Sequence, residues 1–203
     1  RNCPIFKDKN DAKIAKFVYK FIPVFIKESE DEAENPWGVS FQRMFDMSND
    51  SHLFRTRKDM ETAGFVLDGN RFVKGEEVWL PLYEAKMFHQ YDHRFGTFEG
   101  VAKKSQKILP TPNKDQYIDP VYTNQPWYWI NQENVIQKTG LNAGYFISFR
   151  NITNISTNRR TGIFSFIPYS GVAHSAPLMR IDGELSKPCV LLLSNLNSFI
   201  YDF

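Results

Sequence analysis

The residues from Asp68 to Lys86 include an acidic-x-lysine pattern that could support metal-dependent hydrolysis. Glu84 and Lys86, with Asp68 upstream, match the pattern of magnesium-dependent nucleases, in which carboxylates hold the metal and lysine supports the attacking water. In a continuous strand, Glu84 and Lys86 share one face. Asp68 also fits the turn Asp68-Gly69-Asn70, and so short a pattern has many chance matches. A magnesium-dependent nuclease centred on Glu84 and Lys86 is therefore kept as an alternative function.

The residues that follow are rich in imidazole and other hydrogen-bonding groups. His89, Asp92 and His93 have types and spacing that could hold zinc or manganese, although no further ligands lie nearby in the sequence. The same stretch could instead contact DNA phosphates and base edges, or form a buried polar network that braces a sheet. The DNA hypothesis selects Lys86, His89, Gln90, His93 and Arg94, and it assigns no metal ligand.

A second polar segment runs from Arg150 to Thr161 between two expected strands. It combines guanidinium, amide and hydroxyl groups, and DNA readout uses arginine for guanine or phosphate, asparagine for adenine, and serine or threonine for the backbone. An ordinary polar hairpin tip would have a similar composition. The DNA-binding candidates here are Arg150, Asn158, Arg159, Arg160 and Thr161.

Motifs for methyl transfer or phosphate binding are absent from the sequence. No Gly-x-Gly occurs, and Asn35-Pro36-Trp37-Gly38 lacks the second proline of the tetrapeptide that holds a flipped adenine. Gly64 and Gly69 have P-loop spacing but continue into Asn70-Arg71. We therefore expect a chain that performs no chemistry by itself, with no catalytic residues and no cofactor of its own.

The sequence also predicts the helices and strands that must position these residues. Together they indicate a mixed α+β fold of small antiparallel sheets with flanking helices. Apolar periodicity and capping residues predict helices, and β-branched or aromatic runs between turn residues predict strands. The expected helices cover 8–21, 52–63, 132–139 and 186–203, and the expected strands cover 24–26, 65–67, 71–73, 78–88, 127–130, 145–150 and 161–167. The long polar segment 103–120 predicts a linker between two lobes, 1–102 and 121–203.

Composition limits the partners that the chain could have. The net charge of +2 indicates that nucleic-acid contacts come from local patches. Cys3 and Cys189 lack metal-site spacing and are expected to be buried, reduced thiols. No apolar run is long enough to cross a membrane, so we expect a cytoplasmic protein without a membrane partner. A first residue other than Met suits a fragment of a longer protein.

Several motifs along the chain together resemble the region downstream of the catalytic domain in large adenine-N6 DNA methyltransferases. These enzymes include fused restriction-modification proteins and the methyltransferases of bacteriophage-exclusion systems. The resemblance rests on Asn35-Pro36-Trp37-Gly38, Arg43-Met44-Phe45-Asp46-Met47, Leu80-Pro81-Leu82-Tyr83-Glu84-Ala85-Lys86-Met87, His89-Gln90-Tyr91-Asp92-His93-Arg94, Arg150-Asn151-Ile152, Thr157-Asn158-Arg159-Arg160-Thr161 and Leu196-Asn197-Ser198-Phe199-Ile200-Tyr201-Asp202-Phe203. Ala85 and Arg160 depart from it, because glycine and an acidic residue are expected there.

The resemblance implies a target-recognition module. The parent protein would use S-adenosylmethionine and flip an adenine, and this chain would select the sequence. The expected partners are double-stranded DNA and the catalytic domain of the same parent chain. A scaffold for the catalytic domain, docking through the apolar face of the C-terminal helix, is the second alternative.

Overall fold

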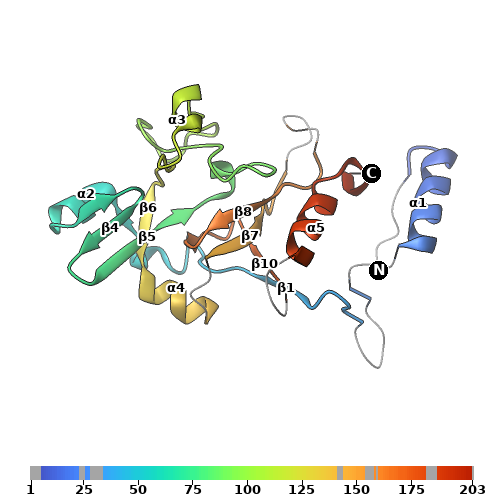
Figure 1. Ribbon diagram of the computed structural model, residues 1–203, viewed down its shortest axis with the longest axis horizontal. Helices are drawn as coiled ribbons and strands as arrows, with labels where there is room; N and C mark the ends of the chain where they lie inside the picture. The colour runs from blue at the N-terminus through green and yellow to red at the C-terminus, as the bar shows by residue number, and fades with distance from the viewer. Residues whose placement is uncertain are drawn as a thin grey trace.

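The protein is an α+β fold with two sheets, as predicted. A computed structural model describes residues 6–22, 26–27, 34–140, 144–153, 158, 160–181 and 187–202. The expectations for Cys3, for most of the strand 24–26, for Arg159 and for Ser186 at the start of the closing helix lie outside the described residues. Figure 1 shows the two sheets side by side in the body of the molecule, with α1 set apart beyond the C-terminus.

The larger sheet is built around a hairpin that the sequence predicts. Gly69 adopts φ +62° in the turn, where a residue without Cβ is favoured. The strand order is β2-β6-β5-β4-β3, all antiparallel, and β9 pairs with β5 in parallel. The bounds are β2 Arg55–Thr56, β3 Val66–Asp68, β4 Arg71–Lys74, β5 Glu77–Tyr83, β6 Tyr128–Asn131 and β9 Gly171–Val172.

The smaller sheet carries the polar segment that follows Phe149. Its order is β1-β10-β7-β8, with all neighbours antiparallel. The bounds are β1 Val39–Gln42, β7 Tyr145–Phe149, β8 Phe164–Pro168 and β10 Leu178–Ile181. The helix α5, Lys187–Leu196, lies against this sheet (Figure 1), and its buried residues Cys189, Leu192, Leu193 and Leu196 form one cluster with Val39, Ile147, Phe164 and Met179.

The remaining helices are short and mostly capped by side chains. Asp8 caps α1, Thr56 and Asn113 form capping boxes at α2 and α3, and Asn131 caps α4. Gly140 ends α4 in the left-handed conformation, directly after the last residue of the helix expected over 132–139. The bounds are α1 Lys9–Phe21, α2 Arg57–Thr62, α3 Lys114–Ile118, α4 Gln132–Thr139 and α6 Phe199–Asp202, with 3-10 turns η1 Ser51–Leu53 and η2 Ala85–Met87.

The strand pairing does not follow the predicted division at 103–120. The edge strand β1 pairs with β10, and β5 pairs with both β6 and β9. Each sheet therefore contains strands from both sides of that segment. The largest buried cluster also joins residues of both halves, from Met44 to Leu178.

Four predicted elements are corrected by the structure. The helix expected over 52–63 begins only at Arg57, because η1 and β2 occupy its first residues. The strand expected over 78–88 ends at Tyr83, and the 3-10 turn η2 begins at Ala85, so Glu84 and Lys86 do not continue a strand face. The 103–120 segment contains α3. The closing helix breaks at Asn197 and Ser198, and its apolar face covers this chain's own sheet.

Candidate nucleic-acid interface

A tight turn at residues 89–92 presents two of the predicted DNA-binding side chains. The amide of His89 donates to the carbonyl of Asp92 at 2.7 Å, and the amide of Asp92 donates back at 3.0 Å. Tyr91 closes the turn with φ +59°, a left-handed conformation that is uncommon for a bulky residue. Because the chain reverses here, His89, Tyr91 and His93 do not lie along one strand face.

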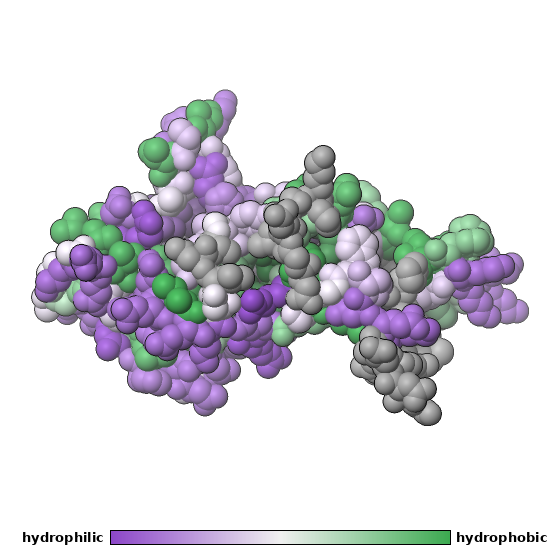
Figure 2. Space-filling view, turned by 60° about the horizontal axis from the view of Figure 1, so that its bottom comes forward, coloured by the Kyte–Doolittle hydropathy of each residue, from purple (hydrophilic) through white to green (hydrophobic). Residues whose placement is uncertain are grey.

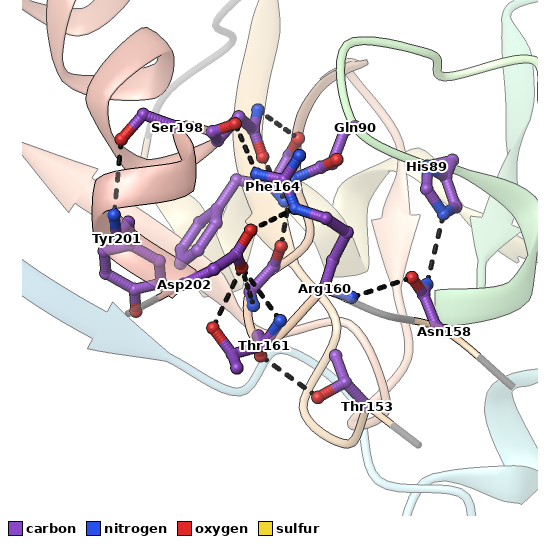
Figure 3. Close-up of polar contacts among 12 residues, drawn as sticks. His89, Gln90, Thr153, Asn158, Arg160, Thr161, Phe164, Ser198, Tyr201 and Asp202 are labelled. Carbon is purple, nitrogen blue, oxygen red and sulfur yellow. Dashed lines mark hydrogen bonds and ion pairs between the residues drawn. The ribbon is translucent and has the colours of Figure 1, made fainter. Parts of the chain in front are cut away.

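The polar segment after β7 lies against this turn, although about 60 residues separate them in the sequence. Arg150 donates from Nε to the carbonyl of Phe88 at 3.1 Å, and its guanidinium lies over the Phe95 ring. Nδ2 of Asn158 lies 3.2 Å from Nε2 of His89 (Figure 3). Gln90 donates to the carbonyl of Gly162 at 3.1 Å. The structure thus brings both predicted segments together.

The end of the chain fixes the base of the same segment. Thr161 donates to Oδ1 of Asp202 from its amide and from its hydroxyl, and Arg160 forms an ion pair with the other oxygen, as Figure 3 shows. Arg160 also donates to the carbonyl of Asn197, and its guanidinium lies 4.9 Å from the centre of the Phe199 ring. The side chain of Asn197 pairs with the amide and carbonyl of Phe164.

Sequence reasoning missed the roles of Asn197 and Asp202. Both are polar residues in a largely apolar C-terminal run, and Asn197 is only 5% exposed. A polar residue at a buried position of an amphipathic helix usually has a specific hydrogen-bonding partner. That signal could have suggested a contact, but it could not have named the partner.

The electrostatics at His89 favour a neutral imidazole. Burial lowers the pKa of His89, the charges of Arg150 and Arg160 lower it further, and Asp92 opposes them only in part. A neutral ring leaves one nitrogen able to accept a hydrogen bond, which suits the Asn158 amide beside it. The cationic groups between turn and loop are therefore the guanidiniums of Arg150 and Arg160, and that of Arg160 is paired with Asp202.

Lys86 and Arg94 lie in contacts of another kind. Lys86 donates to the carbonyls of Lys104 and Gln106 at 3.1 and 3.0 Å. Arg94 donates to the carbonyls of Tyr117 and Asp119, both at 3.0 Å, at the C-terminal end of α3 where helix carbonyls lack partners. Both cations therefore hold the 103–122 segment against the body of the protein.

The residues of the nuclease alternative are not assembled into a site. The Glu84 carboxylate forms an ion pair with Lys104. Asp68 lies at the β3–β4 turn, two strands away from β5, and its Oδ2 is 3.6 Å from a guanidinium nitrogen of Arg71. Within the described ranges, no group of three or more His, Cys, Asp or Glu side chains is placed to hold a metal ion.

The residues of the metal hypothesis have other contacts. Asp92 accepts hydrogen bonds from the Tyr117 hydroxyl and from the Arg94 amide, both at 2.8 Å. His93 lines an open hollow of about 450 Å³ together with Tyr145, Phe166, Pro168 and Val190. His93 therefore lies at a different surface feature from the loop that contacts His89.

Comparison of the chain with known protein families, with curated proteins and with solved structures found no match. Among the described helices, none has the length and apolar character needed to span a membrane.

Proposed function

We propose that this chain is the sequence-specific DNA-recognition module of an adenine-specific restriction-modification or phage-defence methyltransferase. In this proposal the chain is non-catalytic, the catalytic domain of the parent protein binds S-adenosylmethionine, and the parent acts in the cytoplasm. The recognition surface consists of the turn 89–92 and the loop 150–161. Its partners are double-stranded DNA and the catalytic domain.

The observation that carries the proposal is the contact between Asn158 and His89. It joins two polar segments that are distant in sequence into one surface, with Arg150 and Arg160 on the loop side. Asparagine and glutamine can read adenine through two hydrogen bonds, and arginine can pair with guanine or phosphate. Such a surface offers amide groups of both residue types, from Asn158 and Gln90, beside the guanidinium of Arg150.

The contacts of the loop suggest a division of labour within the proposed surface. Arg160 and Thr161 are bound to Asp202 and Asn197, so we assign them to holding the loop in shape. Base-edge readout would then fall to Asn158, Arg159, His89 and Gln90. Lys86 and Arg94 are reassigned from DNA contact to support of the 103–122 segment, and His93 is left outside the readout set.

The test is selection from a pool of randomised duplexes, followed by sequencing of the bound and unbound fractions and inspection for cuts. Wild-type protein should enrich one short motif and leave the DNA intact. The single variants Asn158→Ala and Arg159→Ala should each weaken discrimination at one position of that motif by about 10-fold, the value of one good base contact.

Arg71→Ala is the matched control, because Arg71 is an exposed arginine on β4, at the opposite side of the molecule from α5 in Figure 1. It should leave the enriched motif unchanged. An intact pool without enrichment would contradict the recognition function. Magnesium-dependent cuts that disappear in Glu84→Ala would favour the nuclease alternative instead.

A further inference from the structure

The helix α1 has an unusual distribution of charge. Its four lysines, Lys9, Lys13, Lys16 and Lys20, are spaced by four, three and four residues. At 3.6 residues per turn they fall within an arc of about 60° and form one stripe along the helix. All four are exposed, and in the described part of the chain none of them forms a salt bridge.

The segment that contains the stripe accounts for the net positive charge of the protein. Residues 7–20 contain five lysines and two aspartates, so the other residues of the chain contain 20 basic and 21 acidic side chains. Long-range attraction of a polyanion depends on such local fields. Without this helix the chain has no excess of positive charge to attract one.

The placement of α1 leaves the stripe open to a long partner. Ala15 is its only buried residue, and Figure 1 shows the helix apart from both sheets, beyond α5 and the C-terminus. In Figure 2 the end of the molecule where α1 lies shows hydrophilic residues beside hydrophobic ones. The stripe spans about 16 Å, which equals the length of B-form DNA, measured along the duplex axis, that carries about five phosphates on each strand.

We infer that α1 is a second DNA-contacting element, which binds the phosphate backbone through its lysine stripe independently of sequence. The inference rests on the proposed function for its partner, a DNA duplex, and it adds a backbone clamp to the readout surface. Backbone contacts of this kind provide affinity and salt dependence, whereas base contacts provide specificity.

The geometry of the helix favours DNA over an anionic membrane. Ile14 and Phe21, 48% and 63% exposed, lie about 130° and 110° around the helix from the middle of the lysine stripe, and Val18 lies about 170° from it. Phe17 and Tyr19 flank the stripe, at about 70° and 90° from its middle. A helix that lies in a membrane surface immerses its apolar side and benefits most from lysines at the edges of that side, where they reach the headgroups. Here the lysines would point away from the bilayer when the apolar side entered it.

The test compares wild type and three variants of the chain for binding to a labelled duplex of random sequence at graded salt concentrations. The stripe variant is Lys9→Gln/Lys13→Gln/Lys16→Gln/Lys20→Gln, and glutamine keeps a helix propensity close to that of lysine. The matched control is Lys58→Gln/Lys103→Gln/Lys107→Gln/Lys114→Gln, which removes four exposed lysines elsewhere. Circular dichroism of each protein checks that the helices are intact.

The stripe variant should reduce the slope of log affinity against log salt by about 3 to 4, the value for four phosphate contacts. It should weaken binding to every duplex by the same factor, and the control should change the slope much less. A stripe-by-arginine variant, Lys9→Arg/Lys13→Arg/Lys16→Arg/Lys20→Arg, should keep the wild-type slope. Equal losses in the stripe variant and the control would overturn the inference.

Further outcomes separate this inference from the proposed function. If the selection shows no sequence preference but the stripe variant still loses affinity, the recognition function fails and the clamp stands. If the preference persists and the stripe variant binds as wild type does, only the clamp fails. A third outcome concerns phosphatidylserine vesicles. If wild type binds these vesicles and the stripe variant does not, while both bind DNA with equal affinity, the clamp is overturned in favour of a membrane.

Discussion

Thr161 donates two hydrogen bonds to the same oxygen of Asp202, one from its amide and one from its hydroxyl, each 2.9 Å long. The other oxygen of Asp202 pairs with Arg160. One carboxylate near the end of the chain therefore fixes two consecutive residues at the base of the proposed recognition loop. Its removal should loosen the loop as well as the packing of α6.

Asp202→Asn should lower the free energy of unfolding by about 2 to 3 kcal/mol, because Arg160 loses its charged partner in a mostly buried contact. Urea denaturation measures the change. Glu61→Gln is the control, because it breaks the exposed Arg57 pair, which should be worth less than about 0.5 kcal/mol. Equal effects of the two substitutions would show that the Asp202 contacts do not stabilise the fold.

The same carboxylate predicts a dependence on pH. Burial raises the pKa of Asp202, but hydrogen bonds from Thr161 and Gly162 and the charge of Arg160 outweigh it, so the folded pKa lies below the ordinary value. The stabilisation is therefore complete above about pH 4, which is close to the pKa of the carboxyl in the unfolded chain. It is lost as the pH falls through the lower pKa of the folded state. Denaturation at about pH 5 and pH 3 should show the difference between wild type and Asp202→Asn shrinking with acid.

Tyr91 stores backbone strain in the turn that carries His89 and Gln90. A left-handed conformation costs a residue with Cβ about 1 to 2 kcal/mol, a cost that glycine does not have. Tyr91→Gly should therefore be about 1 kcal/mol more stable to unfolding than Tyr91→Ala. Both variants lose the hydroxyl contact with the carbonyl of Ser194, so the comparison isolates the backbone. An alanine variant as stable as the glycine variant would contradict the strained turn.

Arg94 tests the reassignment of the predicted DNA contacts. Arg94→Gln should lower stability by about 1 to 3 kcal/mol, because two carbonyls at the end of α3 lose a charged donor. The enriched DNA motif should stay the same. Arg71→Gln, at an exposed turn, should change stability by less than about 0.5 kcal/mol. A changed motif in the Arg94 variant would return this residue to the readout surface.

Gly171 lies where β9 packs against β5. A Cβ at this position would overlap the side chain of Ile130 and lie 3.2 Å from Cδ1 of Leu82. Gly171→Ala should therefore lower the free energy of unfolding by about 1 to 3 kcal/mol, the usual cost of overpacking. Gly144→Ala is the control, because nothing lies within 4 Å of its added Cβ. Thermal and urea unfolding of both variants measure the difference.

The sequence determined the local elements whose signals are complete within a few residues. The hairpin around Gly69, the helix Gln132–Thr139 with its glycine cap and the strand beginning at Tyr145 all appear as predicted. Turn chemistry, capping and apolar periodicity act between near neighbours, so the sequence contains them directly. It also selected both segments that meet in the proposed recognition surface.

Only the tertiary structure decided which distant residues meet. The pairing of β1 with β10, the contact of Asn158 with His89 and the attachment of Thr161 to Asp202 join residues that no local pattern relates. The same contacts direct Lys86 and Arg94 toward backbone carbonyls, although their residue types alone suggested phosphate. A cation binds whichever acceptor the folded chain places beside it, and that placement depends on long-range packing.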